Sequence, residues 1–345
     1  MSTQEHTKDV VASLGAVVSG GEVTGDGMSI QARGYWEQVW IRFRRDKVAI
    51  AGGIFIIFLF IAAFAGAPIA EKLLGHGPND EYFTALNKLG LPVGPFSHVE
   101  DTLHPGHSAF LLLGSDSTLG RDEFLRMLYG AQVSLEVAVF STFFAVLIGT
   151  LLGAIAGYYR GWVDTIISRV TEITMAFPFL LFAIALASTI GSRLNSITFG
   201  FLGQGVFTLV VIFSMFGWYY AARIVRSVVL SLREKEFIEA ARMVGASDWR
   251  IIRSHILPHL VAPVIVYSTL AVASYVLAEA GLSYLGLGIQ LPTASWGNLL
   301  QSASDFYLSQ PWLMVWPGLA VLLTTLAFNL MGDGLRDAFD PRAAH

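Results

Sequence analysis

Long uncharged apolar segments recur along this chain at lengths that match membrane-crossing helices. A helix needs about 20 mostly apolar residues to cross a hydrocarbon core of roughly 30 Å. The pattern predicts six transmembrane helices, at residues 48–70, 137–159, 173–192, 194–222, 260–281 and 312–331. The fourth segment is glycine-rich at its start, so we expect its helix to begin near Val206. The chain is therefore expected to be an all-α integral membrane protein.

Lys and Arg side chains concentrate in alternate connections between these segments. The connection at 223–255 is the richest, with Arg223, Arg226, Arg233, Lys235, Arg242, Arg250 and Arg253. The connection at 282–311 has neither Lys nor Arg. Because cytoplasmic loops carry the excess of basic residues, this asymmetry predicts that both termini are cytoplasmic. Residues 1–30 lack the pattern of a secretory signal, and a basic run at 42–47 precedes an uncleaved first helix.

The segments between and around the helices complete the expected organisation. Residues 1–34 predict a flexible cytoplasmic tail, 35–70 an N-terminal segment with the first helix, and 71–118 an extracytoplasmic loop. Residues 119–335 predict a core of five transmembrane helices with a cytoplasmic loop at 230–258, and 336–345 a cytoplasmic C-terminus. Within the core, residues 119–135 read as an amphipathic lead-in whose charged face carries Arg121, Asp122, Glu123 and Arg126.

Composition narrows the function classes. Hydrophobic residues make up 54% of the chain and charged residues only 14%, against about 25% charged in an average soluble domain. The net charge of -4 argues against a nucleic-acid partner. With no cysteine, the chain has no disulfide, no thiolate zinc site and no cysteine nucleophile.

Three features inside the predicted helices invite a structural or a functional interpretation. Gly149, Gly153 and Gly157 recur at steps of four, a spacing that lets another helix backbone approach closely. Pro178 removes a backbone donor and predicts a kink. Glu279 is the one carboxylate near membrane depth, and it must face protein or water. Either neighbouring groups satisfy it, or it lines the translocation path or pins the following LSYLGLG segment.

Catalytic and metal-binding patterns are missing from the sequence. There is no P-loop and no H-E-x-x-H, and GLSYL at 281–285 lacks the closing glycine of a nucleophile elbow. The loop histidines His76, His98, His104 and His107 are expected to be solvated, and no metal site is predicted. Any ATP hydrolysis linked to this chain must therefore take place on a partner.

The segment 230–258 has the pattern of a short helix, a sharp turn and a second helix. Apolar positions give the expected helix faces, namely Phe237, Ala240, Ala241, Val244, Trp249, Ile252 and Ile256. Gly245 predicts the end of the first helix, and Ser247 or Asp248 is expected to cap the second. Adjacent alanines let a partner surface approach closely, and the flanking charges would orient it.

This segment resembles the EAA signature of permease subunits in bacterial ABC importers. The quoted matches are EAARMVG at 239–245, GSDSTLGRDEFLRMLYGAQVSL at 114–135, GYYRGWVD at 157–164, AEAGLSYLGLG at 278–288, SWGNLL at 295–300 and NLMGDGLRDAFDPR at 329–342. Together they resemble the C-type subunit of the dipeptide/oligopeptide (peptide/nickel) permease group over roughly residues 40–342. Residues 1–34 and 71–113 follow no pattern of that group.

The resemblance implies a type I ABC importer permease fold in the bacterial inner membrane. It implies a second, B-type permease chain, two ATPase subunits that bind ATP and Mg, and an extracytoplasmic substrate-binding protein, with no cofactor bound by this chain. The residues that match the docking helix of the family are Glu239, Ala240, Ala241, Arg242, Gly245, Ala246, Ser247 and Asp248.

The cargo and two other protein classes remain open at this point. Di- or oligopeptides are the default for the resemblance, and nickel or glutathione are alternatives within the same machinery. An ion-coupled secondary transporter would need titratable groups near the midplane and repeated halves, and Glu279 is its one candidate carboxylate. An intramembrane hydrolase lacks a nucleophile and base pair.

Overall fold

The computed structural model describes residues 34–100, 108–197 and 205–340, and for 190–197 it describes the backbone alone. The chain divides into two compact units, 1–40 and 41–345, and the packed helices belong to the second. Helix α2 (Tyr35–Phe43) crosses this division. The predicted tail at 1–34, apart from its last residue, lies outside the described residues, as do His104, His107 and residues 341–345.

Within the described residues, five helical runs are long and apolar enough to cross a membrane, and one bent pair adds a sixth. The first run joins α3 (Lys47–Ile61), the π-helix η1 (Ala62–Gly66) and α4 (Ala67–Leu74). The others are α5 (Glu123–Tyr159), α8 (Val206–Leu232), α11 (Leu257–Tyr284) with its lead-in from Asp248, and α13 (Trp312–Phe339). The predicted start of the fourth helix at Val206 is confirmed.

Three predicted boundaries were wrong. α5 begins at Glu123, so most of the expected lead-in is part of one continuous helix. α8 continues to Leu232, so Arg223 and Arg226 lie in a helix rather than in a loop. α13 continues to Phe339, past the expected end of the core at residue 335. In each case the apolar segment ends at a charged residue, but the helix does not. The charged side chain contacts other protein groups or solvent, and the backbone stays helical.

The predicted third span is broken rather than continuous. α6 (Gly161–Ala176) and α7 (Phe179–Ile197) meet at an angle of 83°. Phe177 has extended backbone angles, φ -86° and ψ 129°, as expected for a residue that precedes a proline. Pro178 cannot donate a backbone hydrogen bond, so the helix ends before it. The kink predicted at Pro178 is confirmed, and a single straight helix at 173–192 was wrong.

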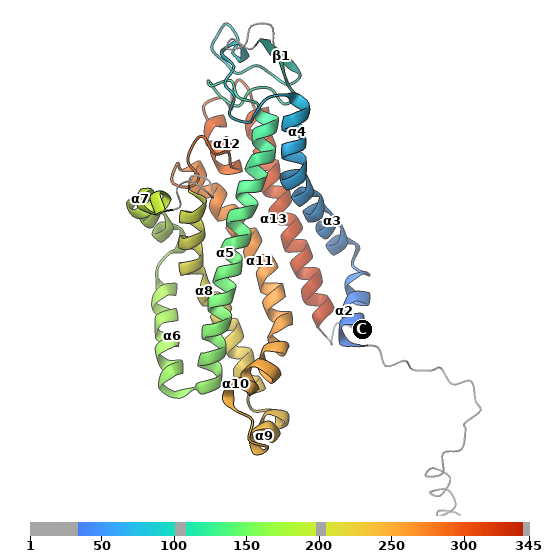
Figure 1. Ribbon diagram of the computed structural model, residues 1–345, viewed down its shortest axis with the longest axis vertical. Coiled ribbons are helices and arrows are strands. Elements are labelled where there is room, and N and C mark those ends of the chain that lie inside the picture. The colour runs from blue at the N-terminus through green and yellow to red at the C-terminus, as the bar shows by residue number, and fades with distance from the viewer. Residues whose placement is uncertain (1–33, 101–107, 198–204, 341–345) are drawn as a thin grey trace, which may run out of the picture. The chain divides into compact units, whose positions relative to one another are not determined.

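α5 lies along α8, and α11 lies between α5 and α13 (Figure 1). A Cβ added at Gly149 or Gly153 would lie 2.4 Å from a backbone carbonyl oxygen of α8. One added at Gly157 would lie 2.8 Å from the Val229 side chain. The glycine row therefore sets how closely the two helices approach, as the four-residue spacing indicated.

One end of the second unit carries a folded cap, residues 75–122, described without 101–107. Strands β1 (Ser97–Glu100) and β2 (Ser108–Leu111) pair antiparallel, with Ser97 opposite Leu111. The 3₁₀ turn η2 (Phe83–Ala85) completes it. The small core of the cap consists of Tyr82, Ala85, Val99, Ala109 and Leu111. The predicted loop is thus a small structure with its own buried side chains.

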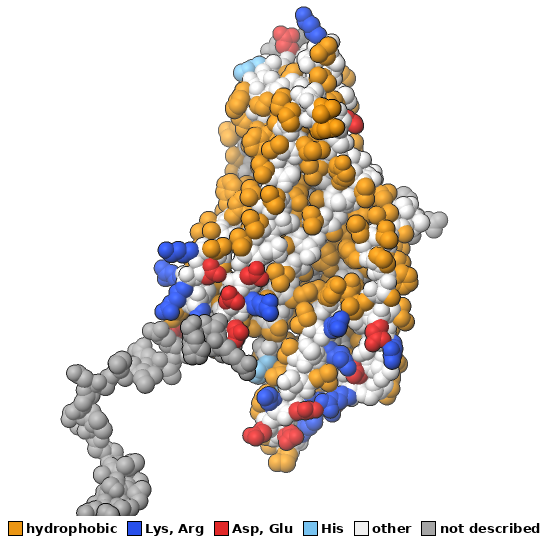
Figure 2. Space-filling view, turned by 180° about the vertical axis from the view of Figure 1, so that it is seen from behind, with side chains coloured by type: hydrophobic (Ala, Val, Ile, Leu, Met, Phe, Trp, Pro, Cys, Tyr) orange, Lys and Arg blue, Asp and Glu red, His pale blue; other side chains and the backbone are white. Residues whose placement is uncertain are grey.

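The other end carries α9 (Glu236–Met243), α10 (Asp248–Ile251) and the π-helix η3 (Ile252–Ile256), which leads into α11. The first turn of α3 and the last turns of α13 meet toward this same end (Figure 1). There Arg42 Nη1 donates to the Asp340 carbonyl at 2.9 Å. Figure 2 shows hydrophobic side chains over the middle of one face and most charged side chains toward the α9 end.

Candidate functional site

The α9–α10 element, residues 236–251, contains a tight turn at Gly245. Gly245 has φ +84°, in the left-handed region that glycine adopts without a Cβ clash. Its N–H donates to the Arg242 carbonyl at 2.9 Å, and the Ala246 N–H donates to the Ala241 carbonyl at 3.0 Å. These two bonds form a Schellman motif, which satisfies carbonyls at the end of α9. The predicted helix end at Gly245 is confirmed.

The predicted cap of the following helix was wrong. Ser247 occupies the N-cap position of α10, yet its side chain makes no capping hydrogen bond. The carboxylate of Asp248 instead accepts a hydrogen bond from the Tyr158 hydroxyl at 2.6 Å. α10 is a single turn that continues directly into η3. The Asp248 side chain therefore ties this turn to α5.

Tyr158, at the end of α5, contacts several elements at once, and the sequence did not predict this role. Besides its bond to Asp248, its backbone carbonyl accepts from Arg233 Nη1 at 2.6 Å. The guanidinium carbon of Arg242 lies 5.4 Å from the centre of its ring, within cation–π range. Tyr158 thus contacts α9, α10 and the residue that follows α8. The signal available in the sequence was its place in the GYYRGWVD motif.

Two ion pairs join the first turn of α6 and the residue before it to α8 and the residues after α8. Asp164 binds Arg226 through two hydrogen bonds, with Arg226 Nε at 2.5 Å and Nη2 at 2.7 Å. Arg160 pairs with Glu234, just before α9. The hydrogen bond from Arg160 lowers the pKa of the exposed Glu234 carboxyl. The start of α6 is therefore connected to α8, and the residue before α6 is connected to the segment that leads into α9.

Apolar side chains of the α9–α10 element divide into a buried set and an exposed set. Ile238 and Ile251 are buried against the ends of α5 and α8, together with Ile252 and Ile256 of the adjoining η3. Exposed are Phe237 at 40%, Trp249 at 66%, Met243 at 88% and Val244 at 89%. Ile238 was absent from the predicted faces, although it is the residue that anchors α9.

The structure brings the predicted docking residues together around this one turn. Ala241 and Ala246 are half-buried and pack against the buried isoleucines. The exposed members are Glu239, Ala240, Arg242, Gly245, Ser247 and Asp248. An exposed apolar surface on a hydrogen-bonded turn, bordered by both signs of charge, is suited to a protein partner.

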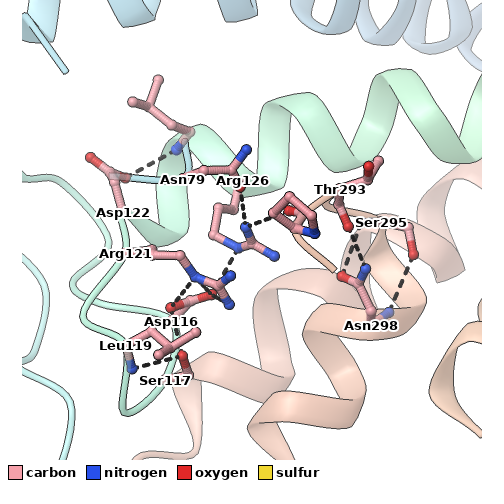
Figure 3. A network of polar contacts seen from close by, with 12 residues as sticks. Asn79, Asp116, Ser117, Leu119, Arg121, Asp122, Arg126, Thr293, Ser295 and Asn298 are labelled. Carbon is pink, nitrogen blue, oxygen red and sulfur yellow. Dashed lines mark hydrogen bonds and ion pairs between the residues drawn. The ribbon is translucent and has the colours of Figure 1, made fainter. Parts of the chain in front are cut away.

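The opposite end holds a buried network of charged side chains (Figure 3). Asp116 Oδ2 lies 2.8 Å from Arg121 Nη2 and 2.8 Å from Arg126 Nε. Arg126 Nη1 also donates to Asn79 Oδ1 at 2.8 Å and to the Pro292 carbonyl at 3.2 Å. Arg126 is 1% exposed. The expected amphipathic surface at 119–135 was therefore wrong, because the cap and the segment after α11 cover these charges.

His76 is buried in the cap, which contradicts the expectation of a solvated side chain. Its Nε2 lies 2.8 Å from Asp122 Oδ2, while Asp122 Oδ1 accepts from the Leu125 N–H at 3.0 Å and so caps α5. Burial alone lowers the pKa of His76, but the hydrogen bond and charge of Asp122 outweigh it and raise the pKa above its ordinary value. His98, by contrast, is exposed.

Glu279 is fully buried, and both of its carboxylate oxygens have partners. Ser134 of α5 donates to Oε2 and Ser283 of α11 donates to Oε1, each at 2.7 Å. The Ser283 hydroxyl in turn accepts from the Ile289 N–H at 3.0 Å. Of the roles considered, pinning the LSYLGLG segment has this geometric support. Lining an open surface of this chain does not, because the side chain is 0% exposed.

Comparison with known families identifies the class of protein. The family described as "Binding-protein-dependent transport system inner membrane component" matches residues 149–345. The chain belongs to this family, whose match covers more than half of it. The "N-terminal TM domain of oligopeptide transport permease C" matches residues 34–89. The family pattern thus includes 71–89, which the sequence reasoning had placed outside it.

Curated relatives narrow the class to the C-type permease subunit of an ABC importer. The glutathione transport system permease protein GsiD of Pectobacterium atrosepticum is 39% identical over 89% of this chain and 91% of its own. GsiD of Escherichia coli O6:K15:H31 is 40% identical over 90% and 92%. The dipeptide transport system permease protein DppC of Alkalihalophilus pseudofirmus is 39% identical over 89% and 90%. The resemblance stated from the sequence is confirmed.

Solved structures agree on the fold. A chain of the MetNI methionine ABC transporter in an inward-facing conformation superposes with a TM-score of 0.51 at 19% identity. The match covers 62% of this chain and 96% of that one. The permease fold of an ABC importer is thereby confirmed. The chain is a membrane protein of the bacterial inner membrane and a permease subunit of an ABC importer, so the ion-coupled secondary transporter is set aside.

Proposed function

We propose that this chain pairs with a B-type permease chain to form the path through which an ABC importer carries di- or oligopeptides. The names of the relatives, which specify glutathione and dipeptide transport, support a peptide-like cargo. Glutathione is itself a tripeptide, so a peptide-like cargo covers both glutathione and dipeptides. Nickel import by the same machinery is the alternative.

The observation that carries the proposal is the exposed surface of the α9–α10 element. Met243, Val244 and Trp249 project from a turn that the Schellman motif, Tyr158 and the buried isoleucines hold in place. Glu239 and Arg242 border this surface with charge. An ATPase subunit docks here, and its movement reaches α5 through Asp248 and Tyr158.

The ATP chemistry belongs to the partners. The sequence has no P-loop to hold nucleotide phosphates, so two ATPase subunits bind ATP and Mg and this chain binds no cofactor. A substrate-binding protein delivers the cargo at the cap. The chain itself supplies the path and the element that couples it to ATP.

This arrangement places the α9–α10 element and both termini in the cytoplasm and the cap outside. The Lys and Arg residues around α9 and α10 support it, as does their absence from residues 282–311. The first turn of α3 and the end of α13 lie toward the same end of the helices as α9 (Figure 1). All three elements therefore belong on the same side of the membrane.

Uptake by cells that lack this chain tests the proposal. In the deletion strain, we expect uptake of labelled Ala-Ala or glutathione to fall to background and to return when the full chain is supplied. Loss of nickel uptake with both peptides unaffected would favour the alternative cargo. If uptake of all three is unchanged, the proposed function is wrong.

A further inference from the structure

A pocket of about 560 Å³ lies between α5, α6 and α8. Its lining residues in α5 and α8, which include Gly153, Ala156 and Ala222, belong to the halves of those two helices that end toward the α9–α10 element. Its volume falls within the roughly 300–1,000 Å³ of small-molecule sites. The polar residues of its wall are Ser168, Thr171, Glu172, Arg223 and Arg226. We call it the α6 pocket.

α6 presents two different faces. Its exposed apolar residues, Trp162, Ile166, Val170 and Ile173, recur at steps of three and four and suit lipid or an apolar partner. The pocket side carries Ser168, Thr171 and Glu172 instead. A charged side chain that faces hydrocarbon is strongly unfavourable. The polar side of α6 therefore faces water, as the wall of an aqueous cavity would.

The two arginines of the pocket differ in their partners. Arg226 is neutralised by the paired hydrogen bonds of Asp164. Arg223 lies in the same wall, and its side-chain contact is the Met175 sulfur at 3.9 Å. In the described part of the chain, no carboxylate lies within ion-pair distance of Arg223. The pocket thus has a cation available to an anionic group.

Glu172, which carries the opposite charge to Arg223, lines the same pocket. Its carboxylate pairs with Arg169 one turn earlier on α6, in a contact that leaves both side chains more than half exposed. Exposed pairs of this kind contribute little to stability, so a ligand ammonium group can replace Arg169 at small cost. The pocket presents both signs of charge to a molecule that carries both.

We infer that the α6 pocket binds the terminal groups of a zwitterionic peptide, with Arg223 receiving its carboxylate and Glu172 its ammonium group. A guanidinium group recognises a carboxylate with two parallel hydrogen bonds, which fits a peptide C-terminus. The inference rests on the proposed function and adds a substrate site on the side where the α9–α10 element lies. The path then holds its cargo next to the helices that the α9–α10 element moves.

Binding to the assembled transporter, purified through a tag on the full chain without nucleotide or binding protein, tests this assignment. The probes are labelled Ala-Ala, glutathione and the C-terminal amide of Ala-Ala. We expect Arg223→Gln to weaken binding of the free-carboxylate probe by about tenfold or more, as loss of a hydrogen bond to a charged group does. The amide should bind both proteins equally weakly, and Arg223→Lys should restore part of the affinity.

Arg44→Gln is the matched control, because it removes an exposed arginine outside the pocket. It should bind the probes as the unaltered chain does. Equal affinity of the unaltered chain and Arg223→Gln would overturn the inference. So would an absence of binding by either free-carboxylate probe, or competition by inorganic phosphate as strong as by Ala-Ala.

A second readout uses the absence of cysteine from the chain. Ser168→Cys places a thiol in the pocket wall, and Ser227→Cys places one on the exposed side of α8. Bound Ala-Ala should slow modification of the first thiol and not of the second; equal rates at both sites overturn the inference. If uptake still requires the chain while these results fail, the pocket assignment falls and the proposed function stands.

Discussion

The Tyr158 hydroxyl donates a 2.6 Å hydrogen bond to the Asp248 carboxylate, which joins the end of α5 to the first residue of α10. Tyr158 is buried and Asp248 is exposed at the edge of the α9–α10 element. A force applied to the α9–α10 element is therefore transmitted directly to α5, which extends from that element to the cap.

Tyr158→Phe removes this hydrogen bond and keeps the ring. A hydrogen bond to a charged group contributes about 1.5–3 kcal/mol, so we expect the two elements to move less tightly together. Uptake per ATP hydrolysed should fall in the reconstituted transporter, while the amount of assembled complex stays unchanged. Tyr159→Phe, at the exposed neighbour, is the control and should leave that ratio as it is. An unaltered ratio in Tyr158→Phe would contradict the proposed route.

Gly153→Ala tests the contact between α5 and α8. The added Cβ would lie 2.4 Å from the Ala222 carbonyl oxygen, so one helix must shift. Overpacking of this kind costs about 1–3 kcal/mol, and we expect a lower unfolding temperature in detergent. Gly281→Ala is the matched change in α11, where a Cβ has nothing within 4 Å. If both variants unfold at the same temperature, the close packing does not determine stability.

Glu279→Ala should lower the unfolding temperature and the uptake together. The change leaves the Ser134 and Ser283 hydroxyls without their acceptor, at about 1–3 kcal/mol for each buried group left unpaired. Glu81→Ala, at an exposed carboxylate of the cap, is the control. Reduced uptake by a variant that unfolds at the normal temperature would instead support a role for Glu279 in the translocation path.

His76 predicts a pH dependence of stability. Its pKa in the folded chain is raised above 6.5, because the hydrogen bond and charge of Asp122 outweigh the effect of burial. Such a group adds stability that is fully present below the unfolded pKa and is lost as the pH rises through the folded pKa. The unfolding temperature of the unaltered chain should therefore exceed that of His76→Gln most at about pH 5 and least at about pH 8. A difference that grows with pH would contradict this account.

The membrane helices and the turn at Gly245 were predictable from the sequence, since both depend on local chemistry. Segment length and hydropathy locate the spans, and the positive φ of Gly245 matches what glycine permits. The break at Pro178 was predictable for the same reason, because proline restricts the residues next to it. The 83° angle between α6 and α7 was not predictable from the sequence.

What the sequence could not show depends on partners that are distant along the chain. Arg126 looked solvent-exposed because charge usually is, but Asp116, Asn79 and the Pro292 carbonyl satisfy it out of water. Tyr158 and Ile238 gave no periodic signal of their own, and their roles follow from how α5, α8 and α9 meet. The partners of Glu279, Ser134 on α5 and Ser283 on α11, likewise follow from how the helices meet.

Co-purification of ATPase subunits with the tagged full chain tests the central claim most directly. Val244→Asp places a charge on the 89%-exposed apolar tip of the α9–α10 element, and Leu89→Asp makes the same change at an 82%-exposed leucine of the cap. The account predicts that Val244→Asp loses most of the bound ATPase and the uptake it drives, while Leu89→Asp keeps the bound ATPase. Unchanged ATPase recovery and unchanged uptake with Val244→Asp would contradict it.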